Sequence, residues 1–142
     1  MNILIVNGPN LNMLGRREPS IYGHQTLDDV LEALKNEFPQ HSLSHFQSNH
    51  EGELVDRLQQ AMADGTQGLV INGGALSHYS YALQDALAML SFPKVEVHIS
   101  HIFAREPFRH RSVISPACTG MISGLGTQGY HLALHWLGKR LP

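Results

Sequence analysis

The chain of 142 residues is 42% apolar and 15% charged, which excludes a disordered or fibrous protein and predicts one domain over residues 1–142. Its net charge of −2 gives no basic surface for nucleic acid, and no apolar run approaches the roughly 18 residues of a membrane-spanning helix. One cysteine, Cys118, excludes an internal disulfide, and the N-terminus lacks a signal-peptide pattern, so we expect a soluble cytoplasmic protein without nucleic-acid or membrane partners.

The first half of the sequence alternates strand and helix signals. A short apolar run predicts a buried strand over residues 2–7. Apolar residues at helical spacing then predict a helix over residues 27–38, and Thr26 is its expected N-cap, because two aspartates follow in the first turn. A weaker strand over residues 42–47 and a second amphipathic helix over residues 54–62 come next.

The second half continues this alternation. In chain order it predicts a strand over 68–72, a helix over 82–90, a strand over 95–99, a polar connection over 102–116, a strand over 121–125 and a helix over 128–140. The polar connection is long and rich in arginine, so we expect it to serve function rather than packing. The final helix is apolar on more than one face, and we expect it to be well buried.

Five strands interleaved with helices predict an α/β fold in which helices cover both faces of a parallel sheet. A flavodoxin-like strand order is the natural expectation for five strands. In such sheets ligands bind at the carboxyl ends of the strands, near the point where the strand order reverses.

Three of the predicted strands end in polar residues. These stretches are Asn7–Asn12 after the first strand, Asn72–His78 after the third, and Glu96–Ser100 in the fourth, followed by Ala104–Arg109. All would lie along one edge of the sheet. Each stretch alone is a weak signal, and their convergence predicts a site there.

The segment from Gly8 to Gly23 is too long and polar for a simple connector, and it resembles a mobile lid. It holds Arg16, Arg17 and Tyr22. One interpretation is a pair of surface arginines beside a partly buried tyrosine. The other is a tyrosine whose hydroxyl is made acidic by arginine, since free tyrosine has a pKa of about 10 and a desolvated cation favours the anion. Arg17 is then the better candidate, with Arg16 or Arg105 as a helper.

His98 lies inside an apolar strand two positions from Glu96, so both side chains point to one face of the sheet. A carboxylate beside an imidazole orients the ring and favours its protonated form, which suits a general acid. The alternative is a buried core histidine with no chemical role.

Metal binding is poorly supported. Glu96, His98 and His101 could be imagined as ligands, and His131 and His135 lie one helical turn apart. The helical pair lacks the glutamate of a zinc-protease motif, and no cysteine joins either set. We expect no metal, and the two helical histidines at the surface or at a subunit contact.

Cofactor and imine chemistry are also poorly supported. No lysine belongs to the polar strand exits, which argues against a Schiff base. Residues 124–129 spell G-x-G-x-x-G, but no strand follows them, so close packing explains these glycines better than a dinucleotide does. We expect no cofactor.

With these motifs the sequence resembles the type II 3-dehydroquinate dehydratases over nearly its whole length. The motifs that carry the resemblance are Asn7–Asn12, Leu14–Pro19 with Tyr22–Gly23, Glu96–Ser100, Ala104–Glu106 with Phe108–Arg109, and Gly124–Gly126 with Gln128–Tyr130.

The resemblance implies roles for five catalytic residues. Tyr22 matches the base that removes the proton α to the substrate ketone, and Arg17 matches the lid arginine that acidifies it. His98 matches the acid that protonates the departing hydroxyl, with Glu96 as its partner. Asn10 matches the residue that holds a water against the enolate.

The resemblance also implies how substrate is bound. Asn72 and the backbone amides of Ile99 and Ser100 match the set that binds the substrate carboxylate. His78 and Arg109 match the residues that bind the ring hydroxyls.

Two further positions complete the implied site. Arg105 matches a second arginine near the lid, and Asp85 matches an acidic residue that reaches a neighbouring subunit's site. Family members form homo-oligomers, typically a dodecamer built as a tetramer of trimers. The implied reaction is the elimination of water from 3-dehydroquinate to 3-dehydroshikimate, in the shikimate pathway or in quinate breakdown.

Two alternatives remain. One is a non-catalytic flavodoxin-like module that binds flavin or a phosphorylated ligand, although the residues after the first strand do not form a phosphate loop. The other is a catalytically silent scaffold, which the intact Tyr22, Arg17 and His98 argue against.

Overall fold

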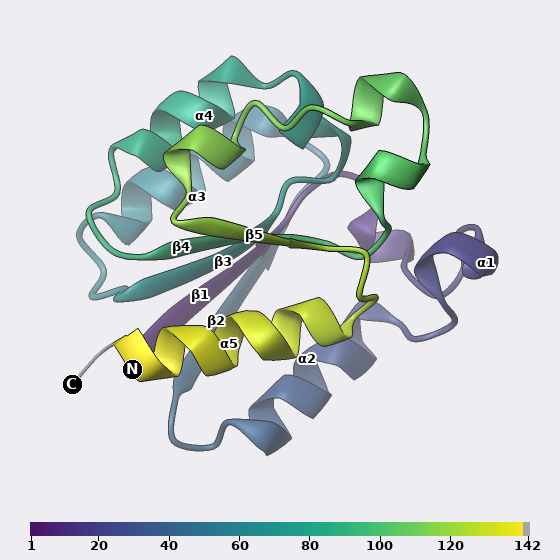
Figure 1. Ribbon diagram of the computed structural model, residues 1–142. Coiled ribbons are helices and arrows are strands. Elements are labelled where there is room, and N and C mark those ends of the chain that lie inside the picture. The colour runs from purple at the N-terminus through teal and green to yellow at the C-terminus, as the bar shows by residue number, and fades with distance from the viewer. Residues whose placement is uncertain (141–142) are drawn as a thin grey trace.

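The computed structural model describes residues 1–140, and it is an α/β fold with one five-stranded parallel sheet (Figure 1). The strands are β1 (Asn2–Asn7), β2 (Ser42–Gln47), β3 (Gly68–Asn72), β4 (Lys94–His98) and β5 (Gly120–Ser123). Their order across the sheet is β2-β1-β3-β4-β5, and every neighbouring pair is parallel. This is the expected flavodoxin-like order, so the predicted fold class is confirmed.

Helices cover both faces of the sheet. They are α2 (Leu27–Glu37), α3 (Glu51–Ala61), α4 (Tyr81–Ala88) and α5 (Gln128–Arg140), whereas the short α1 (Pro19–Tyr22) lies beyond the end of the sheet (Figure 1). In Figure 1, α2 and α5 lie against one face, and α3 and α4 against the other. Successive strand residues point to opposite faces, so β1 places Ile3 and Ile5 in the cluster with α2 and α5, and Leu4 and Val6 in the cluster with α3 and α4.

Two local predictions can be compared with the structure. Thr26 caps α2 as expected, since its hydroxyl accepts from the backbone N–H of Asp29 at 3.1 Å while the Asp29 carboxylate accepts from the Thr26 N–H. The prediction that α5 is well buried is wrong for part of the helix, because Leu132 and Trp136 are 45% and 38% exposed. These two side chains and Met121 line an apolar hollow beside β5, at the edge of the sheet.

The segments that follow the strands gather at one end of the sheet. They include the turn η1 (Leu11–Met13) and helix α1 after β1, and the turn η2 (Gly74–His78) after β3. The expected polar connection after β4 contains three short 3-10 turns, η3 (Ile102–Ala104), η4 (Pro107–Arg109) and η5 (Ser115–Ala117). Gly8 lets the first two exits meet, because a Cβ atom there would lie 2.4 Å from the Gly73 carbonyl oxygen.

Candidate active site

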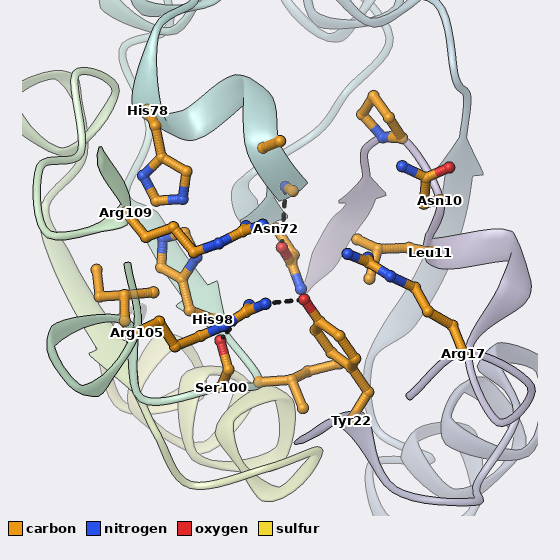
Figure 2. Close-up of a pocket in the computed structure, with 15 residues that line it drawn as sticks. Asn10, Leu11, Arg17, Tyr22, Asn72, His78, His98, Ser100, Arg105 and Arg109 are labelled. Carbon is orange, nitrogen blue, oxygen red and sulfur yellow. Dashed lines mark hydrogen bonds between the residues drawn. The ribbon is translucent and has the colours of Figure 1, made fainter. Parts of the chain in front are cut away.

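A pocket of about 40 Å³ lies at this end of the sheet, at the strand-order reversal between β1 and β3 (Figure 2). Its walls come from all three polar strand exits and from the segment with α1. Among the candidate site residues, only Glu96, Asp85 and the expected helper Arg16 do not line it. The candidates that do are Asn10, Arg17, Tyr22, Asn72, His78, His98, Ile99, Ser100, Arg105 and Arg109.

Two arginines lie beside the tyrosine of the pocket. Tyr22 is 9% exposed, and its hydroxyl accepts a hydrogen bond of 2.6 Å from Nη1 of Arg105 (Figure 2). The guanidinium of Arg17 lies over the ring instead, 4.5 Å from its centroid. Arg105, expected only as a helper, therefore holds the hydroxyl directly. Arg16 is exposed and lines a different hollow, so its expected part as a helper is not supported.

A buried carboxylate supports the histidine of β4. Glu96 is fully buried and His98 is 5% exposed, and Oε2 of Glu96 contacts Nε2 of His98, as the spacing of the two residues predicts. The same carboxylate oxygen accepts a hydrogen bond of 2.6 Å from the Ser112 hydroxyl. Glu96 thus lies behind His98 rather than in the pocket wall, and His98 has Nδ1 left for a ligand.

A second histidine stacks on the first. The rings of His78 and His98 lie 5.9 Å apart at an angle of 23°. Nδ1 of His78 lies 2.8 Å from the Arg111 carbonyl oxygen, so it carries a proton and donates. Burial lowers the pKa of His78, which favours a neutral ring whose Nε2 accepts a hydrogen bond.

Asn72 and Asn10 are held by backbone and side-chain contacts. Asn72 is 4% exposed, and its Oδ1 accepts from the Gly74 N–H at 3.1 Å, while its Nδ2 donates to the Tyr130 hydroxyl at 3.0 Å. Asn10 adopts a left-handed conformation with φ of 71°, which asparagine tolerates better than most residues. Its N–H donates to the side chain of Asn49 at 2.9 Å.

Two negative findings concern the described residues. Within residues 1–140 no group of three or more histidine, cysteine or acidic side chains lies close enough to hold a metal ion. In the same range no helix is both long enough and apolar enough to cross a membrane.

Comparison with known proteins decides the family. Residues 1–138 match the sequence profile of the family described as "Dehydroquinase class II". The chain belongs to the class II dehydroquinase family. A relative from Nitrosomonas eutropha, named 3-dehydroquinate dehydratase, is 57% identical over 94% of each chain. Another of the same name, from Roseiflexus castenholzii, is 55% identical over 96% of this chain and 88% of its own.

A solved structure supports the same assignment. The type II dehydroquinase from Butyrivibrio crossotus is 47% identical, covers 97% of both chains and superposes with a TM-score of 0.95. The pocket described above is therefore the candidate active site of a class II dehydroquinase.

Sequence reasoning missed two residues of this dehydroquinase site. Ser112 supports Glu96 from the connection after β4, and Tyr130 contacts Asn72 from α5. The only sequence signal for Ser112 was its place in the polar connection. Asp85 is exposed on α4 and lies outside the pocket of its own chain.

Proposed function

We propose that this pocket eliminates water from 3-dehydroquinate, with Tyr22 as the base and His98 as the acid. The activity itself, that of a 3-dehydroquinate dehydratase and hence a hydro-lyase, follows from the family and from its relatives. The contact between Arg105 and the Tyr22 hydroxyl carries the proposal, because it puts a cation at the oxygen that must become an anion.

The first step is proton removal by tyrosinate. A positive charge close to a phenolate oxygen favours the anion. Arg105 supplies such a charge at the hydroxyl, and Arg17 supplies another over the ring. The tyrosinate takes the proton α to the substrate ketone, and Asn10 holds a water that stabilises the resulting enolate.

The second step is loss of the hydroxyl. His98 is the acid, and because Glu96 holds its Nε2, Nδ1 is the atom that delivers the proton. The enolate then expels water and forms 3-dehydroshikimate. The acid and the base are both side chains of the protein, and the proposed steps use one bound water and no cofactor.

Binding groups surround the reacting carbons. Asn72 and the backbone amides of Ile99 and Ser100 bind the substrate carboxylate. Neutral His78 accepts from a ring hydroxyl through Nε2, and Arg109 donates to another. All of these residues line the pocket, which is the observation that supports their roles.

The assembly and cellular location belong to the same proposal. We infer a single domain that forms a dodecamer, a tetramer of trimers, in which Asp85 completes a neighbouring copy's pocket. The exposure of Asp85 outside its own pocket supports this. A lone cysteine supports a cytoplasmic location. The proposed reaction would belong to the shikimate pathway or to quinate breakdown.

An ultraviolet assay for the conjugated enone of the product tests the chemistry. We expect Tyr22→Phe to lower kcat by about a thousandfold or more, and His98→Gln by about a hundredfold or more. Tyr79→Phe is the matched control, because that tyrosine is 62% exposed outside the pocket, and it should turn over normally. A kcat of Tyr22→Phe within tenfold of the parent would remove the assigned base.

Borohydride added with substrate checks for an imine. The chain has three lysines, Lys35, Lys94 and Lys139, and none of them lines the pocket. Activity should survive the treatment. Covalent attachment of substrate to a lysine would contradict the tyrosinate route.

A further inference from the structure

We propose that Tyr130 is a positioning residue, whose hydroxyl acts with the Gly74 N–H to hold the amide of Asn72 so that Asn72 presents an N–H, and not an oxygen, to the pocket. The proposal rests on the proposed carboxylate-binding role of Asn72. It adds a reason why this amide selects a hydrogen-bond acceptor such as a carboxylate.

A chain of hydrogen bonds crosses the sheet beneath the pocket. The backbone N–H of Gly74 donates to Oδ1 of Asn72 at 3.1 Å, and Nδ2 of Asn72 donates to the Tyr130 hydroxyl at 3.0 Å. That hydroxyl donates to Oδ1 of Asn7 at 2.5 Å, and Nδ2 of Asn7 lies 3.1 Å from Nε2 of His45. The members come from η2, β3, α5, β1 and β2.

The donor and the acceptor in each of these hydrogen bonds follow from the Gly74 N–H, at which the series begins. A backbone N–H can only donate, so the Gly74 N–H requires the oxygen of Asn72 to face it. The Asn72 nitrogen must then face Tyr130. Because the hydroxyl of Tyr130 has one proton, and Asn72 already donates to its oxygen, that proton goes to Asn7. The nitrogen of Asn7 therefore faces His45, whose Nε2 must accept.

The direction in which burial shifts the pKa of Tyr130 and of His45 agrees with this assignment. Burial raises the pKa of Tyr130, so its hydroxyl keeps the proton that it donates. Burial also lowers the pKa of His45, which favours the neutral ring that can accept. Asp28 opposes this shift and Lys35 adds to it.

A reversed amide would be costly at a buried position. Turning Asn72 around would set its NH₂ group against the Gly74 N–H, two donors facing each other, and would leave a buried donor without an acceptor. In the observed orientation, Oδ1 and one hydrogen of Nδ2 are occupied, and the second hydrogen remains for a ligand. Asn72 lines the pocket (Figure 2), so that hydrogen is the group it offers to substrate.

Steady-state kinetics with a double-mutant cycle test the proposal. The proteins are the parent, Asn72→Ala, Tyr130→Phe and the double variant, with the exposed Tyr79→Phe as a control. We expect Asn72→Ala to raise KM by about tenfold or more, as for loss of a hydrogen bond to a charged group. Tyr130→Phe should raise KM by a comparable factor and leave kcat within about threefold, because ground-state binding is lost.

The KM of the double variant shows whether Tyr130 acts through Asn72. If Tyr130 acts through Asn72, adding Tyr130→Phe to Asn72→Ala should change KM by less than about twofold. Two independent effects that multiply in the double variant would overturn the proposal. So would an unchanged KM in Tyr130→Phe beside a raised KM in Asn72→Ala. A purely structural role of Tyr130 would lower the melting temperature without this coupling.

Two further results separate this proposal from the function on which it rests. If Asn72→Ala leaves KM unchanged, its carboxylate role fails and the positioning role of Tyr130 fails with it. Failure of the tyrosinate chemistry would show as a near-normal kcat in Tyr22→Phe. That measurement is independent of the variants at Asn72 and Tyr130. Should Tyr130→Phe not fold, Asn7→Ala removes the acceptor of the Tyr130 proton together with the donor to His45. It should raise KM by about threefold or more, and an unchanged KM would overturn the directed chain.

Discussion

The guanidinium of Arg105 bridges the hydroxyls of Tyr22 and Ser100, at 2.6 and 3.2 Å from its Nη1. Tyr22 lies 83 positions earlier in the sequence, on the segment after β1, while Arg105 and Ser100 both follow β4. The bridge therefore joins the segment that carries the base to the connection after β4. Both are parts of the site that must be in place before the phenol can lose its proton.

Replacement of Arg105 tests the importance of this bridge. Arg105→Met removes the cation that donates to the Tyr22 oxygen, and we expect kcat to fall by about a hundredfold or more, as for loss of a donor to a developing anion. Arg17→Met removes only a charge over the ring and should cost less. Arg16→Met is the matched control and should be near normal. A loss in Arg16→Met equal to that in Arg105→Met would mean that overall charge, not this contact, matters.

Replacement of Ser112 tests the support of the acid. Ser112→Ala removes a hydrogen bond of 2.6 Å to the fully buried carboxylate of Glu96. The free energy of unfolding should therefore fall by about 1–3 kcal/mol. We also expect kcat to fall by about tenfold, because Glu96 orients His98 less well. Chemical denaturation and the enone assay measure the two effects. Ser115→Ala is the control, and Ser112→Ala should differ from it in both measurements.

β1 and β3 could be predicted with their observed bounds because they are short apolar runs with clear ends. The run over 68–72 is fully buried and coincides with β3. The convergence of strand exits also follows from parallel topology, which is why most site residues could be named. The exposed side of α5 could not, because apolar spacing does not tell whether a core or a surface hollow receives Leu132 and Trp136.

Contacts between distant residues were the harder part of the site. The sequence places Arg17 five positions before Tyr22, which favours it as the partner of the hydroxyl. The structure brings Arg105 to that oxygen through the turn η3, whose path no local pattern fixes. Ser112 and Tyr130 were missed for the same reason, since each contacts its partner only after the chain has folded.

The single cysteine should be inert in the folded protein. Burial raises the pKa of Cys118 to about 12, so at pH 8 very little of the thiol is in the ionised form that reacts. A chromogenic disulfide reagent should release almost no colour from native protein and one equivalent in denaturant. Rapid reaction of the native protein at pH 8 would contradict the raised pKa of this half-buried thiol.

The pH dependence of stability tests the neutral state of His45. Its folded pKa lies below the usual value of 6.5, so below that pH the unfolded chain binds a proton that the folded chain excludes. The stability that His45 contributes is present above pH 6.5 and is lost as the pH falls. His45→Gln keeps an acceptor for Asn7 but has no group to titrate. We therefore expect equal melting temperatures at pH 7.5 and a steeper fall toward pH 5.5 in the parent.

His41 and His78, whose pKa values are also lowered, contribute equally to both proteins and cancel in the comparison. Parallel melting curves would mean that His45 is not held neutral at the end of the Asn7 hydrogen bond.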